Sequence, residues 1–108
     1  MDAINEYLQK HKTLKRFPSY DLVIRELAPQ IECNDGFKMS VQVSHTHYCR
    51  PRINDAPLYF SAEIGYPSEV EPLILEYAED KDAPTATVYG EVPVEVINRV
   101  IEKHGGIK

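Results

Sequence analysis

The segment from Phe37 to Cys49 constrains the fold of this chain more than any other part of the sequence. Every second residue is apolar at first, and the same alternation continues into His45, His47 and Cys49. Successive side chains of a strand point to opposite faces of a sheet. The sequence therefore predicts one extended strand over residues 37–49, with these three reactive side chains on the same face as the apolar residues.

The rest of the chain alternates between helical and strand-like patterns. Proline at positions 18 and 29 ends the first two helical patterns, and Ser68 and Glu71 have the spacing of a capping box. We expect helices over residues 2–16 and 19–28, strands over 37–49 and 58–66, a brief helix over 73–77, a strand over 85–92, and a helix from Pro93 to His104. This order, ααββαβα, predicts an α+β domain: a small three-stranded, mainly antiparallel sheet with helices packed on one face.

Length and composition predict a single domain. With 108 residues, of which 43% are apolar, the chain can bury a core without disulfides or metal. We expect a helical N-terminal part over residues 1–33 and a sheet-plus-helix core over residues 34–108. No apolar run reaches the roughly 18 residues of a membrane span, and the first residues lack the order of a secretory signal.

The two cysteines, Cys33 and Cys49, are too few for a disulfide framework. They fit a reducing compartment better than secretion, although one bridge between them remains an alternative. We therefore expect a cytoplasmic protein.

Charge is distributed unevenly along the chain, whose net charge is −5. Residues 1–52 carry eight Lys and Arg against six Asp and Glu, whereas residues 53–102 carry two against eleven. An acidic segment of this kind repels phosphate backbones and attracts basic protein surfaces. The alternative is a solvated acidic surface that only keeps the protein soluble.

Tyrosines accompany the acidic residues. The chain has seven tyrosines and no tryptophan, and Tyr59, Tyr66 and Tyr89 lie opposite the expected core positions or at strand ends. Exposed tyrosines on a sheet suit protein recognition, but helices on both faces of the sheet would bury them. The candidate binding residues of this surface are Tyr59, Tyr66, Glu69, Glu71, Glu76, Glu79 and Asp80.

Two basic segments are candidate anion sites. Arg50 and Arg52 flank a proline beside Tyr48 and could hold a carboxylate, a phosphate or a nucleic-acid backbone. The alternative for each is a solvated charge or an ion pair with a neighbour such as Asp55. Residues 10–16 are also basic but have no interleaved aromatic residues, so we do not expect direct nucleic-acid binding.

The row of His45, His47 and Cys49 could bind zinc, with Cys33 or His104 as a fourth ligand. Cys49 could instead be a nucleophile with His47 as its base. The simpler interpretation is that these residues close the core or face a loop, because their spacing matches no standard zinc motif. No cofactor is expected.

From residue 34 onward the chain contains the blocks CNDGFKMSVQ, HYCRPR, AEIGYPSEVEP and PTATVYGEVPVEVINRVIEKHGG, and this part makes up about two thirds of the chain. In these blocks the sequence resembles a small family of proteins met in phage and prophage genomes. The resemblance implies a setting in a bacterial host cell and no particular chemistry. Small acidic phage proteins are often accessory factors that bind host or phage proteins, and inhibitors of host defence systems are among them.

Three hypotheses follow for the function. The first is a non-enzymatic accessory protein that binds a host or phage protein with a basic surface. The second is a small metal-dependent or thiol enzyme that uses His45, His47 and Cys49. The third is a virion or assembly component, which the sequence does not separate from the first.

Overall fold

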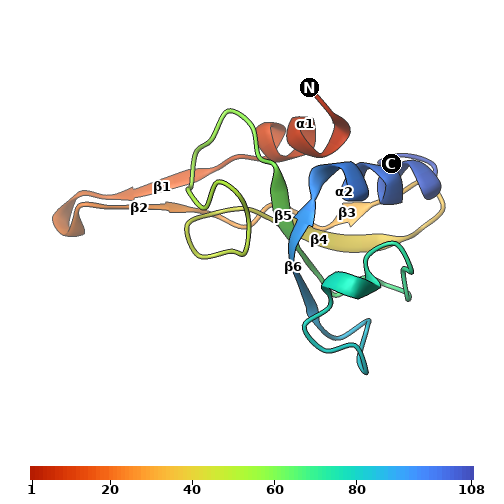
Figure 1. Ribbon diagram of the computed structural model, residues 1–108. Coiled ribbons are helices and arrows are strands. Elements are labelled where there is room, and N and C mark those ends of the chain that lie inside the picture. Colours follow the sequence, from red (N-terminus) through yellow and green to blue (C-terminus); the bar gives the residue numbers. More distant parts are fainter.

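The computed structural model describes residues 1–108 and confirms the α+β class (Figure 1). A four-stranded antiparallel sheet has the order β3 (Ile31–Glu32), β4 (Lys38–Gln42), β5 (Ser61–Gly65) and β6 (Val88–Pro93). The other elements are α1 (Ala3–Lys10), the hairpin of β1 (Leu14–Phe17) and β2 (Leu22–Arg25), the 3₁₀ helices η1 (Pro18–Tyr20) and η2 (Leu75–Tyr77), and α2 (Val94–Lys103). The prediction of three strands in the order ααββαβα is therefore wrong in detail.

The two α-helices lie next to each other along the sheet (Figure 1). The apolar side chains of Ile97, Val100 and Ile101 on α2 are buried, while Val96 is only half-buried. They join a core of 21 buried apolar residues drawn from both helices, the four-stranded sheet and the segments that connect these elements. Neither α-helix has the length and apolar character that a membrane crossing requires.

Helix α2 ends as its sequence predicts. Gly105 and Gly106 have φ angles of 87° and 89°, in the left-handed region that glycine adopts without steric cost. The backbone N–H of Gly106 donates to the carbonyl of Ile101, which satisfies one of the last carbonyls of the helix.

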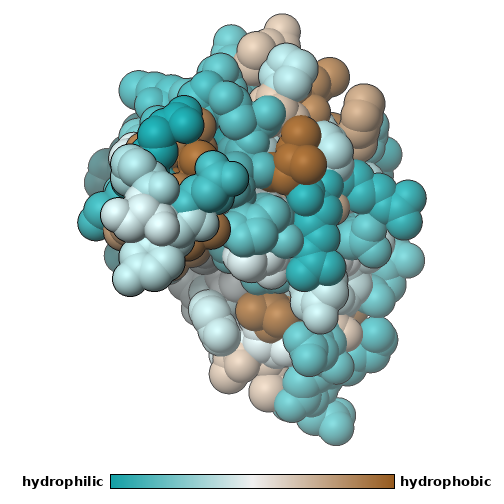
Figure 2. Space-filling view, turned by 90° about the vertical axis from the view of Figure 1, so that its left-hand side faces the viewer, coloured by the Kyte–Doolittle hydropathy of each residue, from teal (hydrophilic) through white to brown (hydrophobic).

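The predicted second helix is replaced by the hairpin of β1 and β2, here called the arm (residues 14–25). Its strands pair from Leu14 with Arg25 to Phe17 with Leu22, and Asp21 in the turn has a φ of 49°. Pro18 favours the turn, and the β-branched pair Val23-Ile24 favours a strand over a helix. The arm extends away from the sheet (Figure 1) and faces the viewer in Figure 2, with hydrophobic surface among hydrophilic side chains.

The predicted strand over residues 37–49 stops at Gln42. The side-chain amide of Gln42 donates to the Ala28 carbonyl and accepts from the Ala28 N–H, so it binds a distant backbone segment. Ser44 then turns the chain, because its hydroxyl oxygen accepts the N–H of Thr46. Such local hydrogen bonds compete with strand pairing, and they break the expected row of side chains.

The chain between β5 and β6 forms an irregular lobe, residues 66–87, here called the acidic lobe; it hangs below the sheet in Figure 1. It contains η2 in place of the predicted brief helix. Ser68 makes no capping box: its hydroxyl oxygen accepts the N–H of Lys38 instead. Residues 79–84, between η2 and β6, are also irregular structure.

Candidate functional site

The acidic lobe exposes most of the acidic residues predicted to bind a partner. Glu69, Glu76, Glu79 and Asp80 are exposed, and none of them makes an ion pair. Tyr66, at the start of the lobe, is 58% exposed with a φ of 50°. The lobe therefore presents unneutralised carboxylates beside an exposed aromatic ring.

Glu71 is the exception among these acids, because its side chain is only 1% exposed. One of its carboxylate oxygens accepts from Lys103 Nζ at 2.9 Å and from the Leu73 N–H at 3.0 Å. The other oxygen lies 2.7 Å from His104 Nε2. Burial alone would raise the pKa of Glu71, but these hydrogen bonds outweigh it and the pKa lies below its usual value. Glu71 therefore leaves the candidate binding surface.

His104 holds two carboxylates together. Its Nε2 faces Glu71, and its Nδ1 lies 2.6 Å from Asp35 Oδ2, while its ring stacks on Phe37. A carboxylate on each ring nitrogen requires both nitrogens to donate, which only the imidazolium can do. Burial opposes the charge, but the hydrogen bonds to Glu71 and Asp35 prevail and raise the pKa of His104. This ion cluster ties the turn at residues 34–36 to the end of α2, and its histidine has no nitrogen left for a metal.

Two of the three tyrosines expected at the surface are buried. Tyr59 is 2% exposed, and its hydroxyl donates to the Ile53 carbonyl at 2.7 Å. Tyr89 is fully buried and donates to the Pro84 carbonyl. For Tyr59 the prediction failed because residues 58–60 precede β5, which starts only at Ser61, so strand alternation does not apply to them. Tyr89 lies within β6, on the face that packs into the core. The ring exposed beside β5 is that of Phe60, at 64%.

His45, His47 and Cys49 do not form the predicted row, and each makes a hydrogen bond of its own. The His45 Nδ1 lies 2.8 Å from Asn54 Oδ1, and the His47 Nδ1 lies 2.5 Å from Ser44 Oγ. Cys49 is buried, and its thiol donates to the Ser44 carbonyl. No group of three or more His, Cys, Asp or Glu side chains is arranged to hold a metal ion.

Neither thiol has the environment of a nucleophile. Burial raises the pKa of the Cys49 thiol, and burial together with the nearby charge of Asp35 raises the pKa of Cys33. The pKa of His47 is lowered, chiefly by burial. A thiol attacks as its thiolate, so both cysteines fit inert core positions. They are free, and the alternative of one bridge between them is not seen.

Arg50 and Arg52 have separate partners. The Arg50 Nε donates to Glu91 Oε1 at 2.6 Å, and both side chains are exposed. Arg52 lies over the Tyr48 ring at 5.1 Å and donates to the His45 carbonyl. The predicted alternative of an ion pair is thus correct for Arg50, but its partner is Glu91. Asp55 pairs with Lys12.

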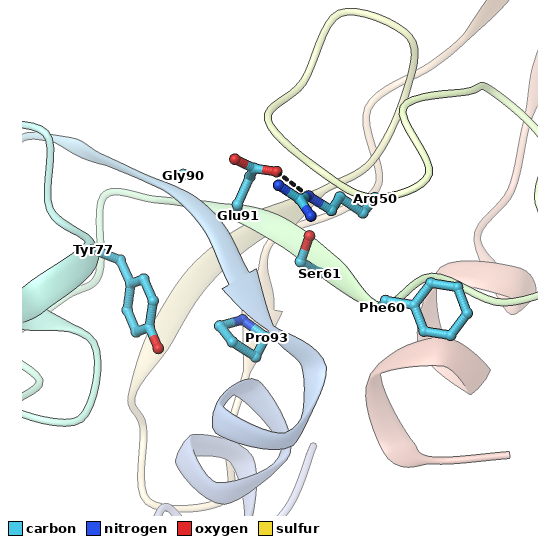
Figure 3. A pocket seen from close by; sticks show the side chains of 7 residues that line it. All are labelled: Arg50, Phe60, Ser61, Tyr77, Gly90, Glu91 and Pro93. Carbon is cyan, nitrogen blue, oxygen red and sulfur yellow. Dashed lines mark hydrogen bonds and ion pairs between the residues drawn. The ribbon is translucent and has the colours of Figure 1, made fainter.

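An open hollow of about 480 Å³ lies beside the Arg50–Glu91 pair (Figure 3). It is lined by Arg50, Phe60, Ser61, Tyr77, Gly90, Glu91 and Pro93. The hydroxyl of Ser61 is buried and has no hydrogen-bond partner, which costs about 1–3 kcal/mol in a folded protein. In Figure 3 it points toward the Arg50 guanidinium.

The backbone gives this hollow its shape. Ala62 pairs with Val92 and Ile64 with Tyr89, so Gly90 and Glu91 together face a single residue of β5. This is a β-bulge, and it aims the side chain of Glu91 at Arg50. Glu91 has a φ of 49°, which is uncommon for a residue with a side chain.

Sequence reasoning identified Arg50 but missed Ser61, Phe60 and Glu91, because a bulge leaves only a weak trace in a sequence. The glycine at position 90, within an otherwise strand-like run, is the one signal that could have indicated it. No family model, no curated protein and no solved structure matches the chain.

Proposed function

We propose that this protein is a non-enzymatic accessory factor that binds another protein through the acidic lobe, in the cytoplasm of a bacterial cell that carries the phage or prophage. The partner has a basic surface, and inhibition of a host defence system is one role of this kind.

One observation carries the proposal: the exposed carboxylates of the lobe are not neutralised by the protein's own cations. Lys81 is the one cation within residues 66–87, and its Nζ donates to the backbone carbonyl of Glu76 rather than to a carboxylate. Unpaired charges of one sign raise the rate at which an oppositely charged partner associates. The exposed ring of Tyr66 and the exposed side chain of Val70 add apolar contact area beside these charges.

The enzyme hypothesis has no such support. It requires His45, His47 and Cys49 to act together, whereas the three make separate hydrogen bonds and the thiol is buried. Arg50 and Arg52, with their separate partners, also give no two-arginine anion site.

The test is charge reversal within the lobe. A variant with Glu76→Lys, Glu79→Lys and Asp80→Lys should lose most of its capture of the natural partner from a host lysate, on the order of 10-fold or more. All three side chains are exposed, so the variant should fold. Capture is measured by quantitative mass spectrometry of the bound proteins.

A matched control reverses three exposed carboxylates outside the lobe: Glu26→Lys, Glu95→Lys and Glu102→Lys. These residues also make no ion pair. Both variants replace three carboxylates by three lysines, so they change the net charge equally. The control should capture the same protein at close to the wild-type level. Equal capture of the partner by the wild type, the lobe variant and the control would show that the acidic lobe does not bind the partner.

A further inference from the structure

The hydroxyl of Ser61 is the one buried side-chain polar atom of the protein without a hydrogen-bond partner. Ser61 is only 6% exposed and lines the hollow beside β6. Its oxygen points toward the guanidinium of Arg50, which lies over it in Figure 3. Buried polar groups are almost always paired, so a group that is not paired indicates a position at which a ligand can supply the missing bond.

Arg50 covers this hydroxyl with a side chain that can move. Only its Nε is hydrogen-bonded, to Glu91, and both partners of this pair are exposed to solvent. Exposed ion pairs contribute little to stability, so the arginine can shift at small cost. Its two terminal nitrogens make no hydrogen bond and form a planar fork that fits a carboxylate.

Glu91 and the walls of the hollow restrict the ligand further. Only one oxygen of Glu91 is bonded to Arg50, and the other can accept an N–H. A phosphate dianion carries twice the charge of a carboxylate, so Glu91 would repel it more strongly, and it would find only one arginine. The rings of Phe60, Tyr77 and Pro93 supply apolar walls.

We infer that this hollow binds the C-terminal carboxylate of a peptide whose last residue is apolar. The carboxylate accepts from the Arg50 fork and from the Ser61 hydroxyl, and the amide N–H of the last residue donates to Glu91. The apolar side chain packs against Phe60 and Tyr77. This inference rests on the proposed protein-binding function, because it names the part of a partner that enters the hollow.

The experiment titrates the isotope-labelled full chain with an acetylated Gly-Gly-Phe tripeptide that has a free C-terminal carboxylate. We expect chemical-shift changes centred on the backbone amides of Phe60, Ser61, Gly90 and Glu91. The same peptide with an amidated C-terminus should bind at least about 10-fold more weakly. Equal binding of the two forms, or no shift at these amides, would overturn the inference.

A third peptide, amidated at its C-terminus and carrying a glutamate side chain, separates the two sources of a carboxylate. It should bind as weakly as the amidated tripeptide. Binding as tight as that of the free tripeptide would overturn the assignment to a chain terminus.

Variants assign the contacts. Arg50→Gln should weaken binding by about 10-fold and Ser61→Ala by about 5-fold, whereas Arg52→Gln should leave it unchanged. Ser61→Ala removes an unpaired hydroxyl, so its thermal stability should not fall. Wild-type affinity of Ser61→Ala, or an equal loss in Arg52→Gln, would contradict the assigned contacts.

The lobe variant Glu76→Lys, Glu79→Lys, Asp80→Lys should bind the tripeptide with wild-type affinity. Failure of the inference about the hollow can therefore be distinguished from failure of the proposed function of the lobe.

Discussion

Glu71 shows how one residue can leave a charged surface and become part of the core. Its neighbours Glu69 and Glu76 are exposed, whereas its own carboxylate meets Lys103 and His104 at the end of α2. A buried carboxylate is stable only with charge partners and hydrogen bonds, and this one has both. Sequence reasoning placed all three in one acidic surface, because nothing in the local sequence shows which carboxylate finds a distant histidine.

The His104 cluster makes stability depend on pH in a defined way. The pKa of His104 is raised in the folded protein, so its contribution is fully present below the ordinary histidine value of about 6.5. That contribution is lost as the pH rises through the raised pKa. Glu71 and Asp35 have lowered pKa values, so their contribution is lost at the acidic end, as the pH falls through those values.

Replacing His104 should therefore lower the free energy of unfolding more at weakly acidic pH than at alkaline pH. His104→Gln should lower the free energy of unfolding by about 2–3 kcal/mol near pH 6, because Glu71 loses a charged partner. The difference from the wild type should shrink toward pH 9 as the wild-type imidazolium loses its proton. Urea unfolding at several pH values measures this, with His45→Gln as an exposed control. A loss that is the same from pH 6 to pH 9 would contradict the protonated cluster.

At the scale of elements, the predictions held where local sequence decides the structure. The end of α2 at two glycines is a local backbone property, and the buried stripe on α2 follows from helical spacing. The predicted strand over residues 37–49 was too long, because the side chain of Gln42 binds the backbone of Ala28, fourteen residues away, and the strand ends there. The predicted helix over residues 19–28 was wrong, because Leu22 and Val23 fit the apolar stripe of a helix as well as a strand of the arm.

The arm should be the least stable regular element of the protein. Isolated two-stranded hairpins are marginal in water, and Leu14, Tyr20 and Leu22 on this one are exposed. We expect the amides of residues 14–25 to exchange with solvent on the order of 100-fold faster than those of β5, which lies between two strands. Hydrogen exchange followed by mass spectrometry measures this ratio. Equal protection of the arm and β5 would show that the arm is held by contacts absent from this structure.

At the scale of the whole molecule, the arm and the acidic lobe are separate regions that carry different charges. The arm carries Lys15 and Arg16 and extends from the sheet, whereas the acidic lobe, which connects β5 to β6 in the chain, lies below the sheet (Figure 1). Most carboxylates of the lobe make no ion pair. The uneven charge seen in the sequence is therefore also a spatial separation. The unpaired acids of the lobe make it the surface most suited to a basic partner.

The most direct test is the salt dependence of affinity for the protein captured through the lobe. If unpaired carboxylates drive binding, the wild-type affinity should fall steeply, by on the order of 10-fold, as salt rises from about 50 to about 300 mM. The Glu76→Lys, Glu79→Lys, Asp80→Lys variant should bind weakly at every salt concentration with little further loss. A wild-type affinity that does not change with salt and matches that of the variant would contradict the role of the lobe.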